Sequence, residues 1–420
     1  EDWEVSDDQL TWTFTLRDDV TWHDGEPFTA DDVVHSLNRI KEEGQNAWRL
    51  SAVEQITAAD DHTVEIQVAQ PTPNLLANLG AFKGMAIVPE HVDPAELAQE
   101  PVGTGPFSFG SSQSGSSITL EANPDYWGEG PNVEAVEFRF IPEGSTAMAN
   151  LRAGDVHWTD NIPPQDVARV LEGDDIQAEA VPSNDYWYVA FNQNREPFGD
   201  VNVRRALAMA IDREAVTQAA KFDAATVNQT AIPQDSFWHY DYAPFERDVE
   251  EARRLLQEAG AEGLTIDLMV TSEYEETIQA AQVLEANWRE IGVDTNIRTL
   301  DFSAWLAEQG EGNFDAFMLG WLGNIDPDDF YYAQHHTGAN FNFHGYSNAE
   351  VDRLLDEART ETDQDARKEL YDQAVKLIVD EVSYAYLYNP DVVHAWTPQV
   401  SGYTVRPDRA IRFKDVALES

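Results

Sequence analysis

Cysteine is absent from the 420 residues, so the chain cannot form a disulfide, bind a metal through thiolates or use a cysteine nucleophile. Basic residues are scarce as well: 27 lysines and arginines stand against 77 acidic residues, and the formal net charge at pH 7 is −50. A chain with this charge repels phosphate backbones and anionic lipid surfaces. We therefore expect no nucleic acid partner.

The acidic residues are spread along every segment, and only six lysines occur. In dilute buffer such a surface destabilises the compact state by self-repulsion, whereas a Debye length of about 3 Å at 1 M salt removes that penalty. The composition predicts a salt-adapted protein with a halophilic archaeon as its source. The alternative, a partner with a very basic face, would concentrate the acidic residues in one stretch.

Long apolar runs are also missing, since no stretch of about 18 apolar residues is present to cross a membrane. The first residues, EDWEVSDDQLTWTF, contain neither the basic start nor the apolar core of a signal peptide. We expect a targeting segment to lie upstream. The first predicted strand has no preceding layer to pack on, so we also expect the N-terminus to be truncated.

Apolar and aromatic residues are plentiful, at 42% and 11% of the chain with 12 tryptophans. A chain of this length exceeds a typical domain of about 100 to 200 residues, so we expect at least two lobes with a cleft. Residues 1–87 have the alternating pattern of a β-rich module, and helices and strands alternate after it in a mixed α/β order. We find no internal repeat and no low-complexity linker.

Local patterns predict individual elements. The alternation of Trp12, Phe14 and Leu16 is typical of a strand, and Thr29 before acidic residues is typical of a helix N-cap. Two more strands are expected on either side of residues 60–61. An aromatic strand from residue 186 leads into a helix that begins near Asp200.

Motifs for catalysis and metal binding are weak. Residues 103–110, GTGPFSFG, run into a serine-rich loop and lack the lysine and helix of a phosphate site. His335 and His336 are too close in sequence for a usual metal pair, and we expect a solvated loop there. Paired carboxylates occur by chance among so many acids, and no GxSxG motif is present. We predict no enzyme activity, metal or cofactor.

One segment does have the pattern of a cleft edge, namely residues 317–338, FMLGWLGNIDPDDFYYAQHHTG. An apolar strand ends there in Trp321 and leads directly into glycine, amide and carboxylate side chains. Trp321 can stack on a ligand, while Asn324 and Asp326 can fix its polar ends. The alternative is that Trp321 belongs to the core and Asp326 caps the next helix, and both interpretations can hold together.

Six ordered segments resemble the family 5 solute-binding proteins, the dipeptide, oligopeptide and nickel-binding class of ABC importers. The resemblance covers nearly the whole chain. The segments are LTWTFTLRDDVTWHDGEPFTADDVV, PVGTGPFSF, NPDYWGEGPNVEAVEFRFIPEGSTAMANLRAGDV, FNQNREPFGDVNVRRALAMAIDREAV, LGWLGNIDPDDF and NFHGYSNAEVDRLLDEARTETDQDARKELYDQAVKLI.

The resemblance implies an α/β type II periplasmic-binding-protein fold with two lobes, a hinge and an extra β-rich domain. We expect the extra domain, with a remnant of lobe 1, at residues 1–87, lobe 1 at 88–187, lobe 2 at 188–392 and a return to lobe 1 at 393–420. The chain would cross between lobes near residues 187–192 and 388–392.

The resemblance also implies where the ligand contacts lie. Relatives that bind peptides place an Asp at the position of Asn324 to pair with the peptide amino group, and an amide cannot supply that charge. Asp326 would have to replace it. The arginine that some relatives place before the GW motif is Met318 here, and TSEYEE at residues 271–276 has no arginine. Each lost ionic anchor removes roughly 1.5–3 kcal/mol.

We therefore expect a mainly apolar pocket, with Asp160 and Asn161 facing it from the opposite lobe and Trp48 from the extra domain. Its apolar and stacking wall is expected to consist of Tyr188, Phe302, Leu306, Met318 and Trp321. The implied function is capture of an extracellular peptide-like solute by hinge closure, followed by delivery to a membrane permease. Alternatives are an oligosaccharide-binding protein, a secreted hydrolase and a ligand sensor or chaperone. We expect a monomer, lipid-anchored on the outer face of the cell membrane.

Overall fold

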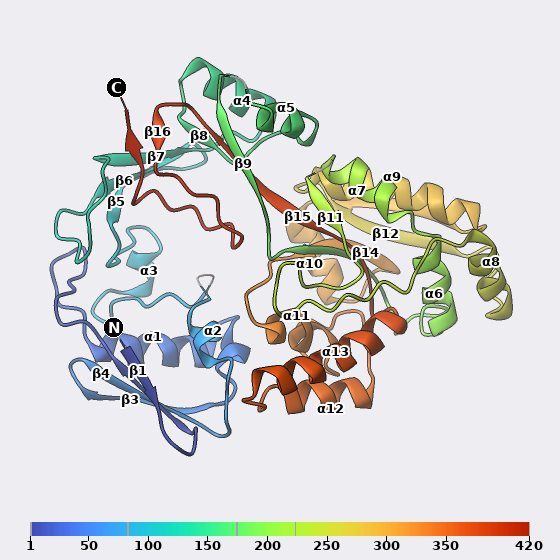
Figure 1. Cartoon of the computed structure of the whole chain (residues 1–420), viewed down its shortest axis with the longest axis horizontal. Coiled ribbons are helices and arrows are strands. Elements are labelled where there is room, and N and C mark those ends of the chain that lie inside the picture. Colours follow the sequence, from blue (N-terminus) through green and yellow to red (C-terminus); the bar gives the residue numbers. More distant parts are fainter. Residues whose placement is uncertain (1, 82–83, 174, 223, 420) are drawn as a thin grey trace.

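The computed structural model describes residues 2–81, 84–173, 175–222 and 224–419. The described residues form three bodies (Figure 1): an N-terminal unit at residues 2–81, lobe 1 at residues 107–182 and 391–419, and lobe 2 at residues 186–389. The predicted mixed α/β architecture is therefore confirmed. The predicted domain boundaries stay a prediction.

The N-terminal unit is a four-stranded antiparallel sheet covered by helices. Its strands follow the order β1, β2, β4, β3. Apolar side chains at alternate strand positions, such as Trp12, Val64 and Ile66, pack against Leu37 of the main helix. Thr29 caps that helix in a capping box with Asp32, as predicted. The elements are β1 (Asp2–Val5), β2 (Thr11–Thr15), α1 (Ala30–Glu43), η1 (Ala47–Leu50), β3 (Val53–Asp60), β4 (Thr63–Val68) and α2 (Leu75–Leu79).

Lobe 1 follows the short helix α3 (Pro94–Leu97) and carries a three-stranded sheet, β5, β6, β7, beside the strands that reach the hinge. The serine-rich segment after residue 110 was expected to be a loop; residues 111–113 instead continue strand β5, which pairs with β6, and residues 114–116 form the turn between the two strands. The elements are β5 (Phe107–Gln113), β6 (Ser117–Ala122), β7 (Ala135–Arg139), α4 (Gly144–Ala153), β8 (Trp158–Thr159), η2 (Pro164–Asp166), α5 (Val167–Leu171), β9 (Gln177–Pro182), β16 (Val400–Ser401) and β17 (Ala417–Leu418).

Lobe 2 is a mixed sheet with helices on both faces. Its strand order is β11, β15, β10, β14, β12, β13, and β12 runs parallel to both β13 and β14. The strands are β10 (Tyr186–Phe191), β11 (Ala225–Val227), β12 (Thr265–Thr271), β13 (Asp294–Leu300), β14 (Ala316–Trp321) and β15 (Tyr384–Trp396). One face packs on α6 (Val201–Ala210), α7 (Arg213–Lys221), α8 (Val249–Glu258) and α9 (Glu275–Glu290). The other packs on α10 (Phe302–Gly310), α11 (Pro327–His335), α12 (Ala349–Ala358) and α13 (Gln364–Asp380).

Period-two alternation divides the central strands between these two faces. In β10, Trp187 and Val189 enter the core under α6 to α9, whereas Tyr186 and Tyr188 enter the core under α10 to α13. The sheet is thus buried on both sides, which explains why β10 is apolar at every position.

The two lobes are joined by a pair of chain crossings. Residues 384–388 of β15 pair with β10 in lobe 2, and residues 391–396 of the same strand pair with β9 in lobe 1. The second crossing therefore lies at residues 389–390, inside the predicted range. The first lies at residues 183–185, just before the predicted range, which instead forms β10.

His335 and His336 lie at the end of helix α11, so the predicted solvated loop is wrong for this segment. Nearly every residue of α11 is buried, so the segment has no amphipathic periodicity that would predict a helix. His335 is fully buried and bonds to Ser383 Oγ at 2.7 Å and to Tyr386 OH at 2.8 Å. His344 Nε2 bonds to the Ser383 hydroxyl at 2.8 Å. Burial lowers the pKa of His335 to about 3 and the pKa of His344 far below its usual range.

We expect this histidine pair to make folding stability sensitive to acid. The unfolded chain takes up a proton below pH 6.5, while folded His335 stays neutral down to about pH 3, so stability falls as the pH drops through that window. The slope approaches about 1.4 kcal/mol per pH unit for each buried histidine. The free energy of unfolding can be measured by denaturant titrations in molar KCl at several pH values. Its dependence on pH should be weaker for His335→Asn than for the wild type. An unchanged slope would contradict the assignment.

Candidate functional site

The carboxyl ends of the parallel strands β12, β13 and β14 lie at one edge of the lobe 2 sheet, where α/β proteins usually bind ligands. The segments that follow these strands expose large apolar side chains. Tyr274 is 38% exposed, Leu306 and Leu322 are 47% exposed, and Ile325 is 68% exposed. A rim of this kind next to a hinge is a candidate ligand-binding surface.

Aromatic side chains behind this rim form a continuous row. The ring centroids of Trp187 and Tyr274 are 5.9 Å apart, those of Tyr274 and Phe302 are 5.6 Å apart, and those of Phe302 and Trp305 are 6.0 Å apart. Phe302 opens helix α10 directly after Asp301, whose side chain caps the helix. The capped helix thus holds the predicted residues Phe302 and Leu306 on one element.

Trp321 ends β14 and is half-buried at the edge of the core that contains Tyr188. Its ring lies 4.9 Å from the Phe341 ring in an edge arrangement, and Phe341 in turn lies 6.5 Å from Trp48 of the N-terminal unit. The indole N–H groups of Trp321 and Trp48 are both buried without an acceptor among the described residues. The structure therefore brings these two predicted tryptophans to one cluster.

Asn324 and Asp326 both have protein partners in this conformation. Asn324 Nδ2 donates to the Ala77 carbonyl oxygen of the N-terminal unit at 3.2 Å. Asp326 caps α11 by accepting from the Asp328 N–H, and its two oxygens accept from Arg367 at 2.7 and 2.8 Å. The capping role considered for Asp326 is confirmed, and this carboxylate is fully engaged.

Two further carboxylates at the start of α11 are almost completely buried. Asp329 accepts from Arg49 Nη2 at 2.6 Å, and Asp328 lies 3.1 Å from Arg359 Nε and 3.0 Å from Asn74 Nδ2. Burial raises the pKa of Asp329 to about 6, although Arg49 acts in the opposite direction. Burial also raises the pKa of Asp328. The raised values show that removing these carboxyl groups from water outweighs their ion pairs.

The structure places Tyr188 and Met318 in the core rather than on the expected wall. Tyr188 is 3% exposed and stacks on Tyr384 with ring centroids 3.8 Å apart. Met318 is fully buried on the opposite face of the sheet, in the core under α6 to α9. Because the two residues belong to opposite faces, they cannot line one pocket together.

Asp160 reaches a small polar cavity of about 130 Å³ that both lobes line at the hinge. Lys221 of lobe 2, Asp391 at the crossing and Arg409 of lobe 1 also line it. Arg409 has a left-handed backbone with φ of 59°, and its Nη1 lies 3.1 Å from Asp185 Oδ2. Asn161, by contrast, donates to the carbonyl oxygens of residues 141 and 142, so it holds a turn within lobe 1.

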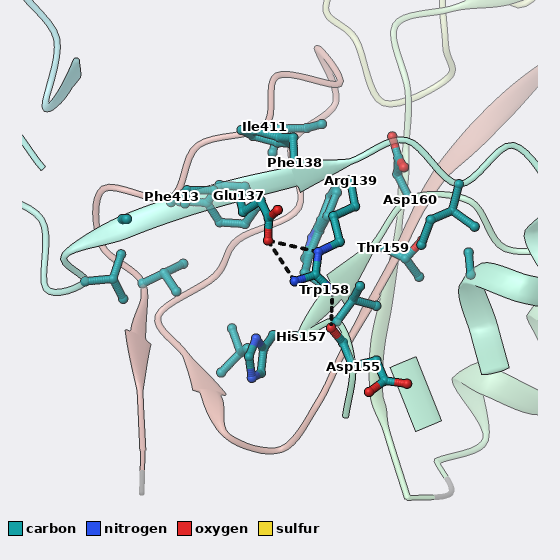
Figure 2. Close-up of a pocket in the computed structure, with 18 of the residues that line it drawn as sticks. Glu137, Phe138, Arg139, Asp155, His157, Trp158, Thr159, Asp160, Ile411 and Phe413 are labelled. Atoms are coloured by element: carbon teal, nitrogen blue, oxygen red, sulfur yellow. Dashed lines mark hydrogen bonds and ion pairs between the residues drawn. The ribbon is translucent and has the colours of Figure 1, made fainter. Parts of the chain in front are cut away.

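A larger hollow of about 540 Å³ lies within lobe 1, between β7 and β8 (Figure 2). Phe138, Trp158 and Phe413 line it, and Arg139, which also lines it, donates to Glu137 at 2.9 Å and to the carbonyl oxygen of residue 155 at 3.1 Å. Every lining residue belongs to lobe 1. This hollow therefore cannot by itself link the closure of two lobes to a ligand.

Several residues of the site were missed by sequence reasoning. Tyr274 follows the carboxyl end of β12, so a topology with parallel strands would have pointed to it. Phe341 and Arg409 sit in irregular segments with no periodic signal. The described residues contain no group of three or more His, Asp or Glu placed to hold a metal ion. No helix in the described part of the chain is both long and apolar enough to span a membrane.

Comparisons with known proteins agree with this architecture. The family model for bacterial extracellular solute-binding proteins, family 5 middle, matches residues 1–343. A dipeptide-binding protein of Escherichia coli K12 is 30% identical over 459 aligned positions, which cover 100% of this chain and 85% of the relative.

Two solved structures extend the agreement to three dimensions. The periplasmic binding protein DppA of Helicobacter pylori, in complex with the peptide STSA, superposes with a TM-score of 0.89 at 26% identity, covering 100% of this chain and 88% of that one. The oligopeptide-binding protein AppA of Bacillus subtilis, in complex with a nonapeptide, has a TM-score of 0.87 at 25% identity, with 100% and 89% coverage. The two-lobed type II periplasmic-binding-protein fold is thus confirmed.

Gly323 provides a test of how tightly the site segment packs on the hinge. A Cβ atom there would lie 2.0 Å from the Asn184 carbonyl oxygen and 2.5 Å from the Phe330 ring. We expect Gly323→Ala to destabilise the protein by about 1–3 kcal/mol through overpacking. Gly310→Ala is the matched control, because its Cβ would meet no atom within 4 Å and the residue ends helix α10. Thermal unfolding of both variants should separate them, and equal midpoints would refute the packing argument.

Proposed function

Because the chain belongs to the family 5 extracellular solute-binding proteins, we propose that it captures a peptide-like solute for an ABC importer. It binds the solute between its lobes, closes about the hinge and delivers the solute to the membrane permease. The observation that carries this proposal is the exposed apolar rim at the carboxyl ends of β12, β13 and β14.

The end of β14 supports an extended ligand. β14 pairs with β10 along its whole length to Trp321, but its pairing with β12 covers only Ala316 and Phe317. The last residues of β14 therefore present main-chain groups on the β12 side. A peptide that lies along this edge gains main-chain hydrogen bonds, and its side chains meet Tyr274, Phe302 and Leu306.

The polar groups of the site support recognition that depends little on charged peptide ends. Asn324 replaces the carboxylate expected for binding an amino group, and its amide already bonds to Ala77. Asp326 is held by Arg367 through both oxygens. We infer that longer peptides, or peptides with blocked ends, bind better than free dipeptides. The alternative is an oligosaccharide, whose rings could stack on Trp321 and Phe302.

Hinge closure follows from the two crossings at residues 183–185 and 389–390. A ligand that contacts both lobes stabilises the closed form by the difference in its affinity for the two forms. On the lobe 1 side, we propose that Asp160 and Arg409, which line the cavity at the hinge, contact the ligand. The closed form then presents a combined surface of both lobes to the permease.

We propose that the protein works as a monomer on the outer face of the cell membrane, anchored through a lipidated upstream segment. Its acidic surface suits an environment of high salt. We propose no catalytic role, and a solute recovered unchanged after incubation with the protein would agree with that. Turnover of a bound peptide or glycan would instead support the hydrolase alternative.

A solute panel tests the proposed function directly. We expect thermal shift and native mass spectrometry in molar KCl to show binding of peptides of about two to eight residues, with end-blocked or longer peptides ahead of free dipeptides. A free peptide concentration of about 100 times the dissociation constant should raise the free energy of unfolding by about 2.7 kcal/mol. Stabilisation by oligosaccharides alone would transfer the function to the saccharide alternative and contradict peptide capture.

Trp321→Ala tests the rim. We expect the variant to remain folded and to lose closure with the best-binding panel peptide, because its ring joins the rim to the Phe341 and Trp48 cluster. Small-angle scattering with and without that peptide measures closure, and circular dichroism checks the fold. Trp3→Ala is the control, since Trp3 is 51% exposed on the distant strand β1. Normal closure of Trp321→Ala would show that Trp321 is only a core residue.

A further inference from the structure

The N-terminal unit meets lobe 2 along a seam that begins beside the ligand rim, where Asn324 and Trp48 lie. On the unit side the seam consists of η1 and α2, and on the lobe 2 side it consists of α11, α12 and the segment before α11 (Figure 1). Arg49 pairs with Asp329 at 2.6 Å, Asn74 Nδ2 donates to Asp328 at 3.0 Å, and Asn324 donates to the Ala77 carbonyl at 3.2 Å.

The seam is built differently from the interiors on either side of it. Among the described residues, the apolar core of the N-terminal unit contains none from lobe 2, and the lobe 2 core under α10 to α13 contains none from the unit. Apart from the edge contact of Trp48 with Phe341, the described residues meet across the seam through hydrogen bonds and an ion pair. Polar surfaces of this kind can separate in water without exposing a large apolar area.

The opposite side of the unit is attached to the segment that leads into lobe 1. His23 Nδ1 accepts from the Gly103 N–H at 3.1 Å, and the other ring nitrogen lies 3.0 Å from the Gly105 carbonyl oxygen. Arg17 lies 4.9 Å over the ring of Trp127. The unit therefore touches both lobes at once, and a hinge rotation must strain or break one of these two attachments.

We propose that the seam is a latch for the closed protein: the N-terminal unit stays with lobe 1, and the Arg49–Asp329 pair and its neighbouring hydrogen bonds separate when lobe 2 rotates away. The latch stabilises the closed form in addition to the ligand contacts and the hinge. The proposal rests on the hinge closure of the proposed function. The test needs no solute, so its failure is distinguishable from the failure of solute binding.

The charges at the seam explain why one residue can control it. The Asp329 side chain is 2% exposed, and among the described residues Arg49 is its only ion-pair partner from the N-terminal unit. Removing Arg49 leaves a buried carboxylate without its cation, which is far more costly than replacing the whole pair by apolar side chains. Arg49→Met should therefore open the seam, and the double variant Arg49→Met with Asp329→Leu should close it again.

The absence of cysteine makes this measurable with two introduced labels. Spin labels at Glu43→Cys in α1 and Gln373→Cys in α13 span the seam, and a second pair at Glu43→Cys and Ser112→Cys joins the unit to lobe 1. All three native side chains are exposed. Distance distributions are measured by pulsed electron resonance on the full chain in molar KCl, together with unfolding midpoints.

We expect Arg49→Met to lose the short-distance population across the seam while the distance from unit to lobe 1 stays unchanged. The double variant should regain the short population. Arg353→Met is the control, because Arg353 lies on α12 and, within the described part of the chain, bonds to Glu350 and Glu357 of its own helix and not across the seam. A folded Arg49→Met protein with an unchanged distribution across the seam would overturn the latch, as would an opening that the double variant fails to reverse.

Discussion

A single strand, β15, supplies hydrogen-bonding edges to the sheets of both lobes, and the rest of the molecule is arranged around that constraint. Its first part pairs with β10 and β11, and its last part with β8 and β9. Any rotation of the lobes must therefore be absorbed at residues 389–390 and at the neighbouring crossing 183–185. Asn389 donates there to the carbonyl oxygens of Asp185 and Ala231, which fixes where the chain can bend.

Charge is the second constraint, because a chain with so many carboxylates must still bury a few of them. The buried carboxylates at the start of α11 are each matched by an arginine from another element: Asp326 by Arg367, Asp328 by Arg359 and Asp329 by Arg49. Two of the three arginines come from lobe 2 and one from the N-terminal unit. The first turn of α11 thus caps its own helix, binds arginines of lobe 2 and contacts the N-terminal unit.

Much of the fold could be predicted from the sequence because period-two alternation and helix caps are local signals. The strands around Trp12 and residues 60–61, the cap at Thr29 and the aromatic strand β10 belong to this class. The site was harder, since side-chain direction depends on which face of a sheet is covered. Tyr188 and Met318 matched the motif but lie in opposite cores, whereas Tyr274 had no motif and lies on the rim. Partners distant in sequence, such as Asn324 and Ala77, leave no local pattern.

The shared strand also sets the order in which the molecule can be assembled. β9 ends at residue 182 and finds its partner only at residues 391–396, so more than 200 residues separate the two halves of that ladder. A chain that emerges from its N-terminus can complete the N-terminal unit and the β5-β6-β7 sheet early, but β8 and β9 of lobe 1 have no partner strand until β15 is available. Until then the hydrogen-bonding edges of β8 and β9 stay unpaired. We expect this part of lobe 1 to fold slowly and to be prone to aggregation.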